Sequence, residues 1–140
     1  MEYVKKDTYE VGDIIYANNF NMNYDWRKPE DETNSKTVKN FFLVVYAEAS
    51  DNMTMHKKNY LALKITTNVV DEAIYACRYD TDRNPFMNKS GFISCSKMHT
   101  FSQNQIIGCM GKLDQLTLKK TFKVYHRFQC ELERQFIDRI

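Results

Sequence analysis

The residues that most often do chemistry in proteins form no specific catalytic or metal-binding motif in this chain. The four cysteines, at positions 77, 95, 109 and 130, include no CxxC pair, and the three histidines do not complete a zinc framework. The sequence also contains no Gly-rich phosphate loop, GxSxG, HExxH or paired-carboxylate pattern. We therefore expect no metal and no cofactor, and we expect the cysteines to be reduced thiols.

Two residues are nonetheless candidates for contact with a nucleic acid. His56 lies beside Lys57 and Lys58 in a polar turn and is a candidate proton donor. Trp26 lies with Tyr24 in a long polar segment, where a large ring has less reason to be structural and could stack on a base.

The charges are unevenly distributed, although the formal net charge is only +2. Residues 1–32 carry four basic and eight acidic side chains, whereas residues 33–127 carry fourteen basic and seven acidic side chains. The basic middle of the chain fits a surface that binds a polyanion, and it fits an ordinary solvated surface equally well.

Length and composition indicate one folded domain, residues 1–140. The 140 residues are 43% hydrophobic and 14% aromatic, which excludes a compositionally disordered chain. No apolar run approaches the roughly 20 residues that span a bilayer. The N-terminal residues do not have the pattern of a signal peptide. We expect a cytoplasmic protein that does not associate with membranes.

Short apolar or alternating segments, separated by polar turns, predict a mainly β fold. The expected strands lie in residues 11–17, which open with a turn, and in residues 41–46, 60–67, 73–79 and 92–96, and residues 105–111 form a last short strand or a turn. Between the first two lies a long polar loop, residues 18–39, and loops of this length are often functional.

One helix is expected at the C-terminal end, over residues 114–136. Asp114 is a good N-cap residue. An apolar stripe with helical spacing follows it, formed by Leu118, Phe122, Tyr125, Leu132 and Phe136. With only one expected helix, a helix-turn-helix DNA reader is excluded.

The order and spacing of three short motifs suggest a family. The first is Gly-Asp-Ile-Ile at residues 12–15, the second is Ile-Thr-Thr at residues 65–67, and the third is Gly-Lys-Leu at residues 111–113, just before the helix. In this arrangement the chain resembles the MazF/PemK-like toxins of type II toxin–antitoxin systems, from about residue 11 to residue 128. The resemblance implies an SH3-like barrel of bent antiparallel strands with a C-terminal helix, and a homodimer.

The resemblance also implies site residues. The family pairs an arginine, usually followed by proline, just before the second strand with a Ser or Thr that ends the third strand. The hydroxyl position falls on Thr66, with Thr67 beside it, whereas the Arg-Pro position falls on Lys39 and Asn40. This is a departure from the family pattern.

Two further residues belong to the implied site. Lys64 stands where the family often has proline, and we expect it to contact RNA, as we expect of Trp26 and His56. Arg27, within the long loop, is a candidate substitute for the missing arginine.

The chemistry explains why the lysine matters. Metal-free RNA cleavage uses the 2′-hydroxyl as nucleophile and needs a base, an acid and fixed positive charge on the phosphorane. Arginine binds two phosphate oxygens with a planar fork, whereas lysine is a point charge whose pKa can fall on burial. Lys39 could therefore act differently from an arginine, or it could mark an inactive nuclease.

The resemblance thus implies a metal-independent, sequence-specific endoribonuclease toxin that cleaves single-stranded RNA and is neutralised by a cognate antitoxin. The alternative is a non-catalytic barrel that binds a protein or a nucleic acid. It is favoured by the missing Arg-Pro and by the acidic first 32 residues. An exposed aromatic patch in the 18–39 loop, away from the threonines, would favour this alternative. A metal- or cofactor-dependent enzyme has little support, because no ligand set is visible.

Overall fold

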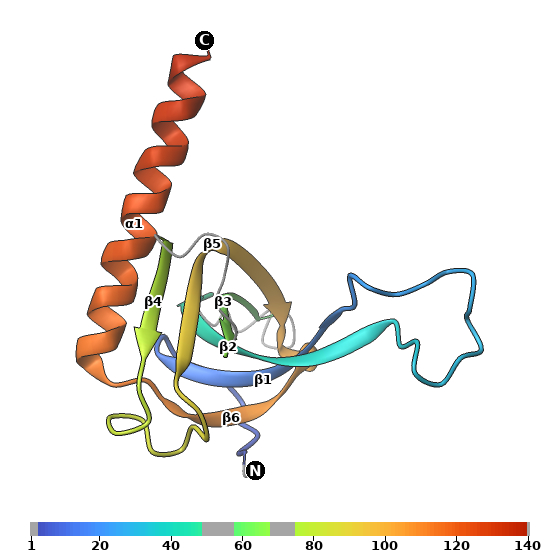
Figure 1. Ribbon diagram of the computed structural model, residues 1–140. Helices are drawn as coiled ribbons and strands as arrows, with labels where there is room; N and C mark the ends of the chain where they lie inside the picture. Colours follow the sequence, from blue (N-terminus) through green and yellow to red (C-terminus); the bar gives the residue numbers. More distant parts are fainter. Residues whose placement is uncertain (1–2, 49–57, 68–74, 140) are drawn as a thin grey trace.

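The computed structural model of the protein describes residues 3–48, 58–67 and 75–139. It consists of a strongly bent antiparallel sheet and one long helix (Figure 1). The elements are β1 (Asp13–Phe20), β2 (Thr37–Ala47), β3 (Asn59–Thr66), β4 (Ala76–Tyr79), β5 (Gly91–Ser102), a short 3₁₀ turn η3 (Gln103–Gln105), β6 (Ile106–Lys112) and α1 (Gln115–Asp138). The expected mainly β fold with a C-terminal helix is confirmed.

The sheet has six strands in the order β4-β5-β3-β2-β1-β6, and each pair of neighbours is antiparallel. Its curvature arises from irregular pairing. On β3, Leu63 pairs with Met98 of β5, whereas Ile65 pairs with Ile93, so β5 carries extra residues between these two points. Such a bulge bends a strand and increases its twist. The start of β5, residues 91–94, pairs with β4, whereas β3 pairs with β5 at residues 92–93 and again at residues 98–102, so the bent strand gives the sheet a barrel-like arrangement.

Apolar side chains are buried on both faces of the central strands, which form two clusters. On β2, Leu43 and Val45 belong to one cluster, and Phe42 and Val44 belong to the other. Successive residues of a strand point to opposite faces, so a strand covered on both sides must be apolar throughout. This explains the continuous apolar run of residues 41–46.

The helix begins where its capping residue predicts. The Asp114 carboxylate accepts a hydrogen bond from the Thr117 backbone N–H at 3.0 Å, and α1 packs against β4 and β5 through its first half. Its second half extends beyond the sheet (Figure 1). Leu132 and Phe136 are consequently 50% and 70% exposed, so only part of the apolar stripe is buried. The helix ends at Asp138, two residues after the predicted end.

The predicted loop over residues 18–39 is too long at both ends. β1 continues to Phe20 and β2 already starts at Thr37, so the connection spans residues 21–36. Residues 18–20 and 37–39, of which only Phe20 and Val38 are apolar, pair with each other in a regular antiparallel ladder. The composition predicted a loop there, but backbone pairing with a neighbouring strand outweighed the weak side-chain preference.

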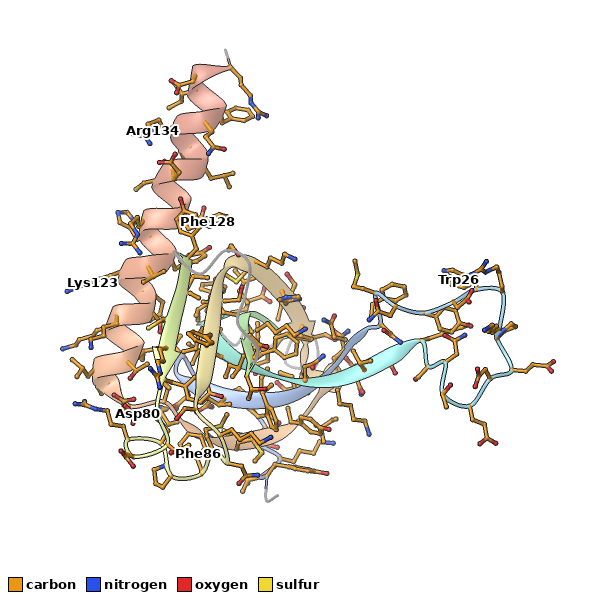
Figure 2. All side chains as sticks on the ribbon, viewed as in Figure 1. Trp26, Asp80, Phe86, Lys123, Phe128 and Arg134 are labelled. Atoms are coloured by element: carbon orange, nitrogen blue, oxygen red, sulfur yellow. The ribbon has the colours of Figure 1, made fainter. Side chains whose placement is uncertain are left out.

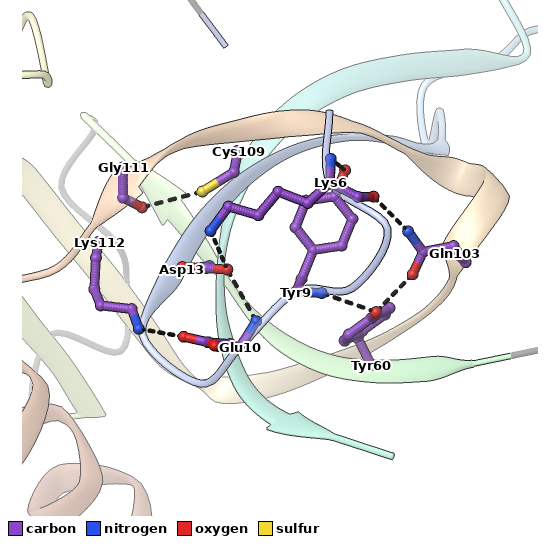
Figure 3. Close-up of polar contacts among 9 residues, drawn as sticks. All are labelled: Lys6, Tyr9, Glu10, Asp13, Tyr60, Gln103, Cys109, Gly111 and Lys112. Atoms are coloured by element: carbon purple, nitrogen blue, oxygen red, sulfur yellow. Dashed lines mark hydrogen bonds and ion pairs between the residues drawn. The ribbon is translucent and has the colours of Figure 1, made fainter. Parts of the chain in front are cut away.

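The N-terminal segment is fixed across one side of the sheet by buried polar contacts (Figure 3). Lys6 Nζ lies 3.2 Å from the carboxylate of Asp13, which is almost fully buried. The Tyr9 N–H donates to the Tyr60 hydroxyl at 3.0 Å, and that hydroxyl donates to Gln103 at 2.6 Å. Burial alone would lower the pKa of Lys6, but its hydrogen bond to Asp13 and the surrounding negative charge raise it.

Two further observations concern the described residues. The four thiols are free, with Cys77, Cys95 and Cys109 buried and Cys130 exposed. Burial raises the pKa of Cys95 to about 12, so this thiol stays protonated. In the part of the chain that the structure describes, no helix is long and apolar enough to cross a membrane.

Candidate functional site

A pocket of about 280 Å³ lies at the end of β3 and contains both threonines of the Ile-Thr-Thr motif. Four segments of the chain contribute to it, namely β2, the end of β3, the segment from Tyr79 to Lys89, and β6. The lining residues are Phe41, Ile65, Thr66, Thr67, Tyr79, Phe86, Met87, Asn88, Lys89 and Met110. No carboxylate is present in this described lining, so the pocket suits an uncharged or anionic ligand.

The position of the threonines depends on strand pairing. Thr66 is the last residue of β3 and pairs with Phe92 of β5, and Thr67 follows it at an exposed position. Gly91 starts β5 directly against this end of β3. A Cβ atom at position 91 would overlap the Thr66 carbonyl oxygen and would lie 2.9 Å from the Tyr79 hydroxyl. The small residue therefore allows β5 to pass close enough to hold Thr66 in place.

Lys89 is the cation that the structure places in this pocket, and the sequence analysis missed it. It lies in residues 80–90, between β4 and β5, on an exposed turn. The only sequence signal for Lys89 was its place in a charged loop between two expected strands. Its proximity to Thr66 and Thr67 results from the pairing of β5 with both β3 and β4, which adjacent residues do not encode.

Lys39 lies close to the pocket but does not line it. The residue sits within β2, opposite Asn18 of β1, rather than just before the strand as predicted. Because side chains alternate along a strand, Lys39 points to the same side of β2 as Phe41, which lines the pocket. The two residues are about 7 Å apart along the strand. Lys39 is exposed and can reach a ligand that extends out of the pocket.

Arg27 and Trp26 lie away from the pocket, in the long connection between β1 and β2. This connection projects from the body of the molecule on the side opposite α1 (Figure 1), and Figure 2 shows Trp26 far from Phe86. The Arg27 guanidinium pairs with Asp25 at 3.1 Å, which holds the pKa of that carboxyl below its usual value. Within one chain, neither residue reaches the threonines.

The connection is nevertheless an ordered structure. Asn34 bridges it by accepting a hydrogen bond from the Asp25 N–H at 2.8 Å and donating to the Asp25 carbonyl at 2.7 Å. Tyr24 packs edge-on against Trp26, with ring centroids 4.8 Å apart, and Lys36 Nζ lies within 6 Å of both centroids. Trp26 remains 68% exposed.

Another predicted RNA contact, Lys64, is not among the residues that line the pocket. Lys64 lies on β3 opposite Phe42 and forms a basic group with Lys97 beside His99. Burial lowers the pKa of His99, and the charges of Lys64 and Lys97 lower it further. The His99 ring contacts Phe42, and its buried Nε2 has no hydrogen-bond partner among the described residues. His56 lies outside the described residues.

The chemical character of the pocket is that of a site for a phosphate with an attached ring. Thr66 and Thr67 offer hydroxyl groups, Lys89 offers positive charge, and Asn88 offers an amide. Phe41 and Phe86 contribute aromatic walls of the kind on which nucleobases stack. Among residues 3–48, 58–67 and 75–139, no three His, Cys, Asp or Glu side chains are grouped so that they could hold a metal ion.

Comparison with solved structures places this chain in a known fold. An endoribonuclease from a mycobacterial species matches with a TM-score of 0.55 and 13% identity, over 87% of this chain and 91% of that chain. A mycobacterial endoribonuclease in complex with its cognate antitoxin matches with a TM-score of 0.54 and 12% identity, over 84% and 91%. The Mycobacterium tuberculosis toxin MazF-mt6 matches with a TM-score of 0.50 and 16% identity, over 64% and 85%.

These matches show that the chain has the fold of the MazF-type endoribonuclease toxins, as the sequence motifs predicted. No family model matches the sequence, and no curated protein matches it. Identities of 12–16% establish a shared fold but assign no role to any residue of this chain. The activity therefore depends on the chemistry of the pocket itself.

Proposed function

We propose that this protein is a metal-independent endoribonuclease toxin that cleaves single-stranded RNA at specific sequences. The observation that carries the proposal is the pocket in which Thr66, Thr67 and Lys89 lie beside aromatic walls, without a carboxylate in the described lining. The shared fold with endoribonuclease toxins supports the same activity.

The proposed reaction is an internal transfer at the phosphate. The ribose 2′-hydroxyl attacks the adjacent phosphorus, its proton goes to a base, and the 5′-oxygen of the next nucleotide leaves as a protonated hydroxyl. The products are a 2′,3′-cyclic phosphate and a 5′-hydroxyl end. Lys89 stabilises the negative charge that develops on the phosphorane, and the threonine hydroxyls donate hydrogen bonds to its non-bridging oxygens. Lys39 holds the RNA backbone at the edge of the pocket.

Cleavage in the presence of EDTA tests this proposal. Wild-type protein is expected to produce 2′,3′-cyclic phosphate ends, and Thr66→Ala and Lys89→Ala are each expected to lower the rate about 100-fold. Matched controls are Thr100→Ala on β5 and Lys119→Ala on α1, both at exposed positions outside the pocket. The controls should cleave like wild type.

The outcomes separate the parts of the proposal. If Lys39→Ala loses activity and Lys89→Ala does not, Lys39 is the catalytic cation, as the family pattern implied. If well-folded wild-type protein leaves every RNA intact in EDTA, the metal-independent nuclease proposal is wrong.

We also propose two protein partners. One solved structure with this fold is in complex with its cognate antitoxin, and we propose that an antitoxin blocks the pocket of this protein. We further propose that the protein is a homodimer, as the family resemblance implied. Light scattering coupled to size-exclusion chromatography tests the dimer, and a single species of about 17 kDa at micromolar concentration would contradict it.

A second candidate function is a non-catalytic binding module, and one observation favours it. Phe20 at the end of β1 and Met22 and Trp26 on the connection that follows expose large apolar side chains, and Figure 2 shows Trp26 on the part that projects from the sheet. Exposed aromatic groups of this kind often mark interaction surfaces. Under this alternative, Trp26→Ala abolishes partner capture, whereas Thr66→Ala leaves it unchanged. RNA cleavage that depends on Thr66 would exclude a purely non-catalytic role.

A further inference from the structure

The segment between β4 and β5, residues 80–90, is fixed to the body of the protein by a buried asparagine. Asn84 is fully buried, and its amide donates hydrogen bonds to the Asp80 carbonyl and the Asp114 carboxylate, both at 3.0 Å. The Asp114 N–H donates back to the Asn84 side-chain oxygen at 3.0 Å. Asp114 is also the N-cap of α1, so this segment and the start of the helix form one rigid unit.

The carboxylate at the centre of this unit is held in its charged form. Burial alone would raise the pKa of Asp114, but hydrogen bonds from Thr117 and Asn84 and the charge of Arg83 lower it below its usual value. The Met87 N–H donates to the Asn84 carbonyl at 3.0 Å, which extends the anchored backbone to the pocket.

The same segment places an aromatic ring against the glycine of β6. A Cβ atom at Gly111 would lie 2.8 Å from the Phe86 ring, so the absence of a side chain at position 111 allows the ring to pack directly on the strand. Phe86 and its neighbour Met87 then line the same pocket as Thr66 and Thr67. Figure 2 shows Phe86 at the end of the sheet where this segment lies, near Asp80.

Next to Phe86 and Met87, the same segment (residues 80–90) places two polar side chains in the pocket lining. Asn88 and Lys89 both line the pocket and are exposed, and neither forms a hydrogen bond or an ion pair with any described residue. A rigid backbone that holds an aromatic ring, an amide and an ammonium group next to each other provides stacking, hydrogen bonding and charge for one nucleotide.

We infer that residues 86–89 form the specificity element of the pocket, in which Phe86 stacks on one base beside the cleaved bond and Asn88 recognises the edge of that base. This inference rests on the proposed function and identifies how the same pocket selects its RNA. Lys89 contacts the phosphate and contributes no sequence information, because phosphate contacts position a nucleic acid and base contacts specify it. The amide of Asn88 offers one donor group beside one acceptor, which the edge of a base can match.

The chemistry of the amide gives a directed test. Cleavage sites are mapped on a pool of RNAs of random sequence, in EDTA, for wild type and for variants at position 88. Asn88→Ala is expected to lower the preference for the base at one position about tenfold. Asn88→Asp replaces the donor by a second acceptor, so the preference at that position is expected to shift to guanine, whose edge offers two adjacent N–H donors.

Three further variants complete the test. Lys89→Ala should slow cleavage of all sequences by a similar factor. Phe86→Leu keeps an apolar side chain but removes the ring, and it should raise KM more than it lowers kcat. Asn104→Asp, outside the pocket, makes the same chemical change as Asn88→Asp and should leave the preferred sequence unchanged.

The results distinguish this inference from the proposed function. If wild-type protein cleaves no RNA, the proposed function is wrong. If wild type cleaves at defined sequences and both Asn88 variants keep the same sequence preference, the assignment of Asn88 is wrong and the proposed function remains. Because Asn88 is exposed, both variants are expected to fold, which matching thermal unfolding curves would verify.

Discussion

Replacement of Asn84 by alanine tests the anchored segment directly. The side chain is fully buried and takes part in three hydrogen bonds, each 3.0 Å long. Asn84→Ala leaves the Asp80 carbonyl, the Asp114 N–H and one oxygen of the Asp114 carboxylate without these partners. A bond between neutral groups contributes about 1 kcal/mol to stability, and one to a charged group contributes about 2 kcal/mol.

The three bonds together therefore amount to about 4 kcal/mol. A water molecule that enters the vacated space would recover part of this energy, so we expect Asn84→Ala to lower the free energy of unfolding by about 2–4 kcal/mol. Asn88→Ala is a matched control, since it makes the same chemical change at an exposed position in the same segment. We expect that control to change the free energy of unfolding by less than about 0.5 kcal/mol.

Urea unfolding followed by far-ultraviolet circular dichroism measures both values, provided that the slope of the unfolding free energy against urea concentration is the same for wild type and variants. A double-mutant cycle with Asp114→Ala should give a coupling energy of at least about 1 kcal/mol, because the Asn84 amide donates a hydrogen bond to the Asp114 carboxylate. If Asn84→Ala and Asn88→Ala unfold at the same urea concentration, the anchoring network does not stabilise the fold. Asn84 would then not be the anchor that holds Phe86 and Met87 in the pocket.

Three further predictions address strand packing, pH and the helix. Gly91→Ala should lower both stability and RNA cleavage, because its Cβ would displace the Thr66 carbonyl; unchanged cleavage would contradict the close approach of β5. Because burial lowers the folded-state pKa of His99, the unfolded chain binds the proton first as pH falls below about 6.5, and wild type should lose stability there. His99→Phe should lose less stability between pH 7.5 and 5, as urea unfolding at both pH values would show. Leu118→Ala should lower the free energy of unfolding by about 2–4 kcal/mol, and Leu132→Ala should lower it by less than about 0.5 kcal/mol, because only Leu118 is buried. Equal melting temperatures for the two variants would contradict this difference.

Much of the fold could be predicted from local patterns. The apolar run at residues 41–46, the Ile-Thr-Thr at the end of β3 and the Asp114 cap all lie where the sequence indicated. These features depend on hydrophobic periodicity or on one capping hydrogen bond, which short stretches of sequence encode. The limits of β1 and β2 were wrong because the mostly polar segments 18–20 and 37–39 become strands through pairing with each other.

The candidate site could be predicted only in part. Thr66 and Thr67 were identified through the family pattern and do line a pocket, but the roles of Lys39 and Arg27 came from a motif that this chain lacks. The structure leaves Arg27 paired with Asp25 and places Lys89 beside the threonines instead.

The sequence by itself determined the apolar parts of the strands, where the helix starts and which residue types are available for chemistry. Only the tertiary structure decided which of these residues meet. Lys89 follows Thr66 by more than twenty positions, and the two come together because β5 pairs with both β3 and β4. Likewise, the apolar stripe of α1 indicates an amphipathic helix, but the extent of the sheet decides that Leu132 and Phe136 remain exposed. Periodicity specifies which face of an element is apolar, whereas its partner depends on contacts between segments that are distant in the chain.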